Sequence, residues 1–345
     1  MIELIHFRTG NLLEDDAEAL VNTVNCVGVM GKGIALQFKQ AYPDVYKEYA
    51  KECKQGNMEI GKVHVVSTDS LFGTKYIINF PTKKHWKEKS KMHYVEDGLQ
   101  DLVKVINDLG IQSVAIPPLG CGNGGLEWMK VKAKIIDAFQ NSPIDIHVYE
   151  PAGSPKPDEM KIRTKKPNMT KSRALLLASM NDYSVPGYRL SLLEIQKIAY
   201  FLQEVGEPLK LRFEKNKYGP YAENLNHVLL RMDGHFIRGF GDRNREAEIY
   251  LLADAAEKAK NYLRNDEESE ERLSKVQQII RGFETPYGME LLATVHWIIR
   301  ENHGSVLTLD FIINEVHNWN ERKRKVFNSK HIEKAWKHFQ KLEFI

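Results

Sequence analysis

Cysteine is scarce in this chain of 345 residues: it occurs only at Cys26, Cys53 and Cys121, without a CxxC motif or a Cys/His pairing. Three scattered cysteines exclude a disulfide framework and a structural zinc site. No stretch approaches the roughly 18 consecutive apolar residues that a membrane span requires. Residues 1–8 also lack the basic region and apolar run of a secretory signal. We therefore expect a cytoplasmic protein with no membrane partner.

The chain also has little net charge, +3, with 42% hydrophobic and 28% charged residues and a mean hydropathy of −0.43. This composition indicates a soluble globular protein, long enough for two domains. Residues 153–173 hold seven Lys and Arg against two acidic residues, three prolines and no apolar periodicity. Such a segment is typical of a basic linker, whose charge could also contact nucleic-acid phosphates. We predict domains at residues 1–152 and 174–345.

The first domain alternates short β-rich runs with helical patterns. The predicted strands are IELIHF, EALVNTVN, KVHVVST, KYIINFP, SVAIPPL and IDIHVYE, and the predicted helices span residues 33–55, 94–109 and 128–139. Strands separated by helices of this length predict an α/β sandwich around a central sheet, mixed or mostly parallel. Ligands of such sheets bind at the carboxyl ends of the strands.

Two glycine-rich segments follow predicted strands and precede predicted helices. The first is VNTVNCVGVMGKGIA at residues 21–35, and the second is PPLGCGNGGL at residues 117–126. Glycine lets the backbone approach an anion closely, and the following helix N-terminus presents amides to phosphate. Neither segment is a Walker loop or a GxGxxG fingerprint. Either alone is compatible with a tight turn, but two such loops on neighbouring strands suit a diphosphate.

These segments, with Gly10-Asn11-Leu12 after the first strand, resemble the macrodomain, an ADP-ribose-binding module, over residues 1–150. The motif NFPTKKHW at residues 79–86 is similar to the lysine-dependent branch, which contains the DNA ADP-ribosyl glycohydrolase antitoxins of bacterial toxin–antitoxin pairs. VMGKGIA, the Thr-Lys pair and the second domain match the antitoxins best. The resemblance implies a three-layer α/β/α macrodomain with a central mixed sheet, followed by a mainly α-helical C-terminal domain.

The resemblance also implies a set of site residues. It makes Lys83 the catalytic residue, places Asn22 and Asn25 beside the distal ribose, and sets Asn11 against the adenine. Many macrodomains have aspartate in place of Asn11, whose carbonyl can accept the same hydrogen bond. The other residues implied to bind ADP-ribose are Leu12, Gly31, Lys32, Gly33, Ile34, Thr82, Leu119, Gly120, Cys121, Gly122, Asn123 and Gly124. The acid of the protein-directed glycohydrolase is missing from the second loop, so its acid-plus-lysine mechanism does not carry over.

The chemistry of Lys83 stays open between two roles. A neutral amine could attack the anomeric carbon, if burial or a neighbouring cation such as Lys84 lowers its pKa. A charged amine could instead stabilise the leaving base or position water. No clustered ligand spacing indicates a metal, and we expect no metal and no cofactor. Trp86 and His85 lie among five lysines of KKHWKEKSK, a pattern suited to nucleic acid, although such a loop can also be merely solvated.

The C-terminal half shows helical periodicity almost throughout, beginning with a stripe from Leu192 to Val205. Further helices are predicted after the YGPY turn (residues 218–221) and at residues 247–263, 270–283, 287–302, 309–319 and 329–342. This half resembles the C-terminal domain of the antitoxin family, which implies that it holds the cognate DNA ADP-ribosyltransferase toxin partly by imitating DNA. Residues 266–271, DEESEE, are the candidate mimic or a solvated helix end. The basic residues 322–325 could bind DNA or only aid solubility.

The leading hypothesis is therefore a DNA-binding hydrolase that repairs DNA. It removes ADP-ribose from the bases of ADP-ribosylated single-stranded DNA, using Lys83, and sequesters the toxin through its C-terminal domain. In the alternative hypothesis, the macrodomain is a non-catalytic ADP-ribose reader fused to a protein-interaction domain. Protein-linked ADP-ribose is a third possibility, disfavoured by the missing acid. A Rossmann dehydrogenase is remote, because no acidic residue follows a GxGxxG loop at the ribose-binding distance.

Overall fold

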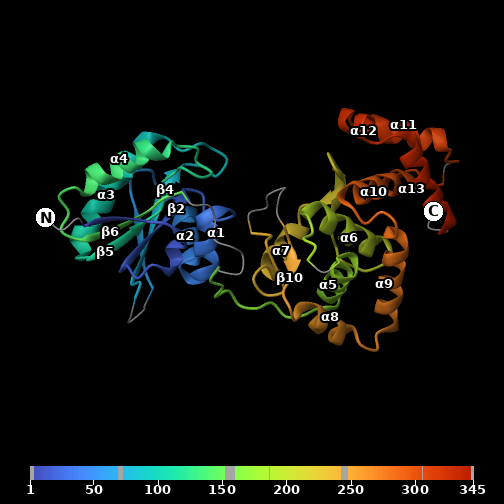
Figure 1. Cartoon of the computed structure of the whole chain (residues 1–345), viewed down its shortest axis with the longest axis horizontal. Coiled ribbons are helices and arrows are strands. Elements are labelled where there is room, and N and C mark those ends of the chain that lie inside the picture. The colour runs from blue at the N-terminus through green and yellow to red at the C-terminus, as the bar shows by residue number, and fades with distance from the viewer. Residues whose placement is uncertain are drawn as a thin grey trace. The chain divides into compact units, whose positions relative to one another are not determined.

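A computed structural model describes residues 4–68, 73–151, 160–185, 187–241, 248–304 and 306–342. The chain divides into two compact units, residues 1–165 and 166–345 (Figure 1). This boundary falls inside the predicted linker, of which residues 153–159 lie outside the described residues. Its described part is not a free tether: Lys161 Nζ donates to the Leu13 carbonyl at 2.9 Å, and Arg163 N donates to the Gln40 carbonyl at 2.9 Å.

The first unit is built on a six-stranded sheet in the order β1-β6-β5-β2-β4-β3. The strands are β1 (Ile5–Arg8), β2 (Ala19–Asn25), β3 (His64–Ser67), β4 (Tyr76–Lys83), β5 (Ser113–Ile116) and β6 (Asp145–Tyr149). Only the pairing of β3 with β4 is antiparallel among these strands. The predicted central mixed sheet is therefore confirmed.

Helices cover both faces of this sheet. On one face, α1 (Gly33–Ala41) and α2 (Pro43–Gln55) contribute Phe38 and Val45 to a core shared with Leu20. On the other face, α3 (Met92–Leu109) and α4 (Trp128–Phe139) form the larger apolar cluster with the sheet. Figure 1 shows these helices flanking the sheet, which confirms the three-layer α/β/α prediction.

The single helix predicted over residues 33–55 is wrong. Two helices form instead, because Pro43 has no amide hydrogen to continue the first one. Tyr42 takes a non-helical conformation between them, and Pro43 occupies the first turn of α2. The break places α1 directly after the first glycine-rich loop as a short, separate helix.

The second unit is mainly helical, as predicted. Its helices are α5 (Lys171–Tyr183), α6 (Leu192–Glu204), α7 (Leu225–Met232), α8 (Ala255–Leu263), α9 (Glu267–Ile280), α10 (Pro286–Glu301), α11 (Leu309–Trp319), α12 (Glu321–Val326) and α13 (Ser329–Lys341). The predicted stripe of α6 lies in the core, and a capping box between Ser191 and Glu194 starts the helix. Helix 247–263 is wrong in its first part, where β10 (Tyr250–Leu251) pairs with β9 (Ile237–Arg238).

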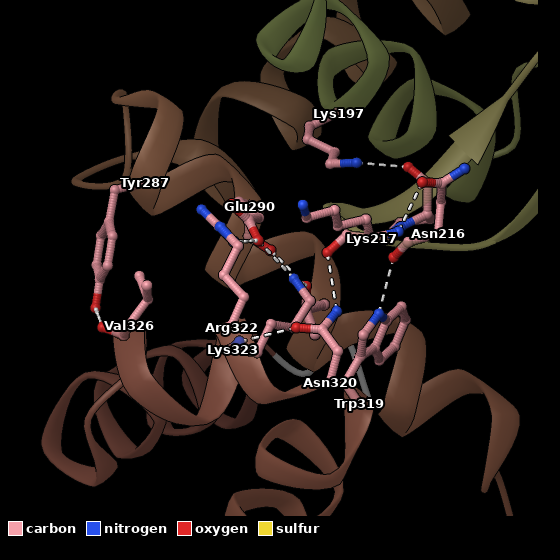
Figure 2. A network of polar contacts seen from close by, with 12 residues as sticks. Lys197, Asn216, Lys217, Tyr287, Glu290, Trp319, Asn320, Arg322, Lys323 and Val326 are labelled. Atoms are coloured by element: carbon pink, nitrogen blue, oxygen red, sulfur yellow. Dashed lines mark hydrogen bonds and ion pairs between the residues drawn. The ribbon is translucent and has the colours of Figure 1, made fainter.

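The predicted YGPY turn is part of a β-hairpin, β7 (Phe213–Asn216) and β8 (Gly219–Ala222). Gly219 has a φ of +88°, which disfavours a side chain there. Figure 2 shows how the hairpin is held: Trp319 Nε1 donates to the Asn216 carbonyl at 2.8 Å, and buried Lys197 donates to the Pro220 carbonyl at 2.5 Å. A tertiary network, rather than the turn sequence alone, fixes this hairpin.

A buried ion cluster lies beside the hairpin and corrects the prediction of an exposed basic run at residues 322–325. Lys323 is fully buried and donates to Glu290 Oε1 at 2.7 Å and to Thr294 Oγ1 at 3.0 Å (Figure 2). Arg322 donates to the same Glu290 oxygen at 2.6 Å. Burial lowers the pKa of Lys323 to about 8. Of the basic run, only Arg324 and Lys325 are exposed.

Candidate functional site

Three strand ends meet at one edge of the sheet of the first unit. Strand β2 pairs in parallel with β4 on one side and with β5 on the other. The first glycine-rich loop leaves β2, Lys83 ends β4, and the second glycine-rich loop follows β5. The loops come close to each other, since a Cβ added at Gly33 would lie 3.3 Å from Asn123 Nδ2. The predicted site residues therefore gather at the carboxyl ends of parallel strands.

A β-bulge sets the direction of Lys83. Val24 lies opposite Pro81, but Asn25 lies opposite Lys83, so Thr82 is the additional residue of β4. A bulge also accommodates Pro81, which has no amide hydrogen to donate to a ladder. Thr82 is buried, and its Oγ1 is 3.5 Å from the Val24 carbonyl. The bulge explains why the side chain of Lys83, at the end of a buried strand, points toward the second glycine-rich loop.

Lys83 contacts the second loop directly. Its Nζ donates to the carbonyl of Asn123 at 2.6 Å. Burial, together with the positive charge of Lys89, lowers the pKa of Lys83. The expected neighbouring cation was Lys84, which is exposed and does not contribute; Lys89, six residues along the chain from Lys83, takes this place. A lowered pKa enlarges the neutral fraction of the amine at a given pH.

The second loop is packed too tightly for side chains at two of its glycines. A Cβ at Gly124 would lie 2.2 Å from the Gly120 carbonyl oxygen and 2.3 Å from Ser90 Oγ. Gly120 has a φ of +70° and faces Ser90 as well. Ser90 N donates to the Gly124 carbonyl at 3.0 Å. Ser90 was missed by the sequence reasoning, because no local pattern reports a contact across 34 residues.

The first loop is organised by Asn25. Its Oδ1 accepts from the amides of Val27 and Val29 at 3.0 and 3.3 Å, and its Nδ2 donates to the Val29 carbonyl at 2.6 Å. Tyr49 OH donates to the Asn25 carbonyl at 2.5 Å. The Asn25 amide was expected beside a ribose, but here it shapes the loop backbone. It fixes the loop backbone ahead of α1, whose first turn has no side-chain cap.

Asn22 belongs to a row of polar side chains across three strands. Asn22 lies opposite Asn79, and Asn79 lies opposite His64. Asn22 Nδ2 donates to Asn79 Oδ1 at 3.0 Å, and Asn79 Nδ2 is 3.4 Å from His64 Nδ1. Within the described part of the chain, the buried Asn22 Oδ1 has no hydrogen-bond partner. A buried carbonyl oxygen without a partner is suited to accept from a ligand, and Asn79, also missed from sequence, orients it.

The remaining predicted residues differ in what they can offer a ligand. Asn11 Oδ1 accepts from Leu13 N at 3.1 Å and so caps a 3-10 turn, η1 (Leu12–Glu14). The side chains of Leu12 and Leu119 are buried in the apolar cores, which leaves only their backbone for binding. Burial raises the pKa of the Cys121 thiol to about 11, so it stays protonated near neutral pH. The others lie along the two loops and in the first turn of α1: Gly31, Lys32, Gly33, Ile34, Gly122 and Asn123.

A second polar cluster lies away from these loops. Among the residues that the structure describes, Asp15, Asp16 and His147 bring ligand atoms within 4.8 Å of one another. The Asp15 carboxylate already accepts from Arg8 at 2.9 Å and from Tyr149 OH at 2.8 Å, and it contacts His147 Nδ1 at 2.7 Å. Because these donors occupy the carboxylate, the cluster is explained by ion pairing within the protein.

The acidic run at residues 266–271 is not a free array of carboxylates. Asp266 and Glu268 pair with Lys171 at 3.0 and 2.7 Å, and Glu268 also pairs with an arginine one turn along α9. Glu271 pairs with Lys275 at 2.6 Å. Three of the five carboxylates thus form ion pairs with neighbours, and the imitation of DNA by this run stays a prediction.

A Macro domain model matches residues 21–135, which confirms the predicted macrodomain. A DNA ADP-ribosyl glycohydrolase of Thermus aquaticus is 47% identical over 333 residues, covering 96% of this chain and 92% of that protein. One of Mycobacterium tuberculosis is 42% identical over 347 residues, covering 95% and 97%. A DNA ADP-ribosyl transferase-DNA ADP-ribosyl glycohydrolase fusion protein of Thermosipho africanus is 35% identical over 43% of this chain and 42% of its own length.

In the part of the chain that the structure describes, no helix has both the length and the apolar character needed to cross a membrane.

Proposed function

The chain belongs to the family of DNA ADP-ribosyl glycohydrolases, and we propose that it removes ADP-ribose from the bases of ADP-ribosylated single-stranded DNA. The observation that carries this proposal is the contact of Lys83 Nζ with the Asn123 carbonyl at 2.6 Å. This hydrogen bond links Lys83 to the second glycine-rich loop at the carboxyl ends of the strands. The first glycine-rich loop lies close by, since Gly33 approaches Asn123. One edge of the sheet thus offers a reactive amine and two glycine-rich backbone segments.

Each part of ADP-ribose is assigned to a group of residues at this site. The diphosphate lies between the start of α1, with Gly31, Lys32, Gly33 and Ile34, and the loop from Leu119 to Gly124. Helix N-termini and glycine backbones bind phosphate through their amides. The distal ribose lies by Asn22, whose Oδ1 is buried without a partner within the described residues. The adenine lies by Asn11 and the backbone of Leu12, and Thr82 supports Lys83 from the bulge.

We assign Lys83 the role of nucleophile. Burial and Lys89 lower its pKa, which favours the neutral amine. Nζ forms a bond to the anomeric carbon as the bond to the base nitrogen breaks, and the electron pair leaves with the base. The attached ammonium gives one proton to the departing base nitrogen, and its remaining N–H proton moves to the ring oxygen as the ribose opens to an imine. Water then hydrolyses the imine to release ADP-ribose and the free amine. No metal or cofactor takes part.

The test is release of ADP-ribose from an ADP-ribosylated single-stranded oligonucleotide by the wild type and by Lys83→Ala. We expect release by the wild type, loss in the variant and retained binding of free ADP-ribose by calorimetry. Borohydride should trap the imine on Lys83. An ADP-ribosylated protein serves as the comparison substrate. If neither protein releases ADP-ribose while both bind it, the macrodomain is a reader and the proposed reaction is wrong.

For the second unit, we propose that it sequesters the cognate DNA ADP-ribosyltransferase toxin. The fusion of the two activities in the name of the Thermosipho africanus relative supports such a partner. The unit has its own apolar core from α5 to α13, so residues 166–345 are a suitable fragment. We expect this fragment to co-purify with the transferase. Co-purification by the full chain but not by the fragment would contradict the proposal.

A further inference from the structure

The segment after Lys83, residues 84–91, is fixed at both ends to the two glycine-rich loops. At its start, the amide of Cys26 donates to the carbonyls of Lys83 and Lys84, each at 3.2 Å. At its end, Ser90 N donates to the Gly124 carbonyl at 3.0 Å. We call residues 84–91 the lysine loop. Its attachment to both glycine-rich loops holds it at the mouth of the proposed ADP-ribose site.

Trp86 is the most prominent apolar side chain of the lysine loop. It is 49% exposed, although a large aromatic side chain normally gains from burial. Neighbours hold it in place: the His85 ring lies 5.5 Å from it, centroid to centroid, and Lys87 Nζ lies 5.0 Å from its ring centroid. The amide of Lys87 also donates to His85 Nδ1 at 3.3 Å. The ring is therefore presented to solvent by a structured turn.

The lysine loop carries four lysines against one carboxylate, Glu88, so its net charge is positive. Among the described residues, no carboxylate forms an ion pair with Lys84, Lys87, Lys89 or Lys91. Elsewhere on the same unit, Lys75, Lys132 and Lys134 each pair with a glutamate at 2.8–2.9 Å. Unpaired lysines around an exposed aromatic ring are the features of proteins that bind single strands, with phosphates on the cations and bases on the ring.

We propose that Trp86 is a stacking platform for an unpaired base next to the ADP-ribosylated nucleotide, with the lysine loop binding the flanking phosphates. The inference rests on the proposed function, since it extends the same site along the DNA. Trp86 is the third residue after Lys83, so their Cα atoms lie within about 11 Å. A base adjacent to the one bonded to the ribose is within reach at that separation. Stacking requires an unpaired base, which makes Trp86 a determinant of specificity for single strands.

The chemistry favours a nucleic acid over a modified protein at this position. A polypeptide carries no regular series of negative charges for the four unpaired lysines to bind. Val27 and Val29 of the first glycine-rich loop, to which the lysine loop is bonded through Cys26, are exposed as well. Alternating flat bases and phosphates match an aromatic ring bordered by cations.

The experiment measures oligonucleotide binding in a Lys83→Ala background, where the substrate stays intact, by fluorescence anisotropy. Two ADP-ribosylated single strands are compared: one with normal flanking bases and one with abasic sites on both sides of the modified nucleotide. Trp86→Ala and Trp86→Phe are added to this background. Leu109→Ala is the matched control, because Leu109 is 46% exposed at the far end of α3, about 27 Å along that helix.

We expect abasic flanks to weaken binding about 5- to 100-fold in the Lys83→Ala background, as stacking strengths predict. Trp86→Ala should weaken binding to the normal strand by a similar factor and should lose the sensitivity to abasic flanks. Trp86→Phe should be intermediate, and Leu109→Ala should match its parent. Free ADP-ribose should bind all variants alike.

Two results would overturn the inference. One is equal sensitivity to abasic flanks with and without Trp86, with Trp86→Phe providing the same comparison if Trp86→Ala does not fold. The other is an equal loss of affinity for free ADP-ribose or for an ADP-ribosylated protein, which would place Trp86 in the ADP-ribose site itself. Failure of the proposed function is a different observation, namely no release of ADP-ribose from DNA by the wild type.

Discussion

The variant Gly124→Ala tests the packing of the second glycine-rich loop. Its Cβ would lie 2.2 Å from the Gly120 carbonyl oxygen and 2.3 Å from Ser90 Oγ, far inside the favourable separation of about 3.5–4 Å. Neither neighbour can move freely, because the Gly120 carbonyl accepts from Leu126 N and Ser90 N donates to the Gly124 carbonyl. Overpacking costs about 1–3 kcal/mol, and one lost hydrogen bond costs about 1 kcal/mol.

The expected loss is therefore about 2–4 kcal/mol in the free energy of unfolding of the first unit, or about 4–15 °C in Tm. Gly122→Ala is the matched control in the same loop. A Cβ there meets no atom within 4 Å, and the backbone is not left-handed, so we expect a Tm close to that of the wild type. The assays are differential scanning calorimetry and titration with ADP-ribose.

We expect both variants to bind ADP-ribose more weakly, Gly124→Ala with a lower Tm and Gly122→Ala without one. In the second variant the methyl group would occupy space that we assign to the diphosphate. Wild-type melting of Gly124→Ala would refute the packing argument. Wild-type ADP-ribose affinity in Gly122→Ala would refute the placement of the diphosphate at this loop.

Three further changes test the site and the second unit. Burial and the positive charge of Lys89 lower the pKa of Lys83, so Lys89→Gln should raise that pKa. Because the rate of ADP-ribose release rises as the amine loses its proton, it should reach half its maximum at a higher pH in this variant. An unshifted pH–rate profile would contradict this. Lys323→Met leaves the buried Glu290 with Arg322 as its remaining ion-pair partner. We expect the free energy of unfolding of the second unit, measured in urea, to fall by about 3 kcal/mol. A loss under about 1 kcal/mol would show that Arg322 alone compensates the charge of Glu290. Asn79→Leu should weaken ADP-ribose binding, measured by calorimetry, by removing the acceptor that orients the buried asparagine of β2, and unchanged affinity would argue against that role.

Much of the first unit follows from local sequence. Alternating strand and helix patterns predicted an α/β sandwich, and the resemblance to the macrodomain implied its three layers. The two glycine-rich segments marked the loops at the carboxyl ends of β2 and β5. Lys83 stood out by its motif. These features can be predicted because apolar periodicity, glycine-rich turns and helix N-termini depend on residues only a few positions apart in the sequence. The division of the α1–α2 region at Pro43 was also present in the sequence but was passed over.

In the second unit, several features depend on contacts between residues that are far apart in the sequence. Its helices were largely predicted, but the YGPY segment became a hairpin because Lys197 and Trp319 bond to its backbone from elsewhere in the chain. The acidic and basic runs looked like exposed charge. In the fold, Lys171 neutralises part of one run, and Glu290 holds Lys323 of the other inside the core.

By itself, the sequence determined which groups are available: two glycine-rich loops, a lysine at the end of a strand and a tryptophan among lysines. Tertiary structure alone decided how these groups act together. The bulge at Thr82 turns Lys83 toward Asn123, and Lys89 rather than Lys84 lowers its pKa. Such effects depend on distances between residues that strand pairing and loop closure bring together, and the order of residues along the chain does not state those distances.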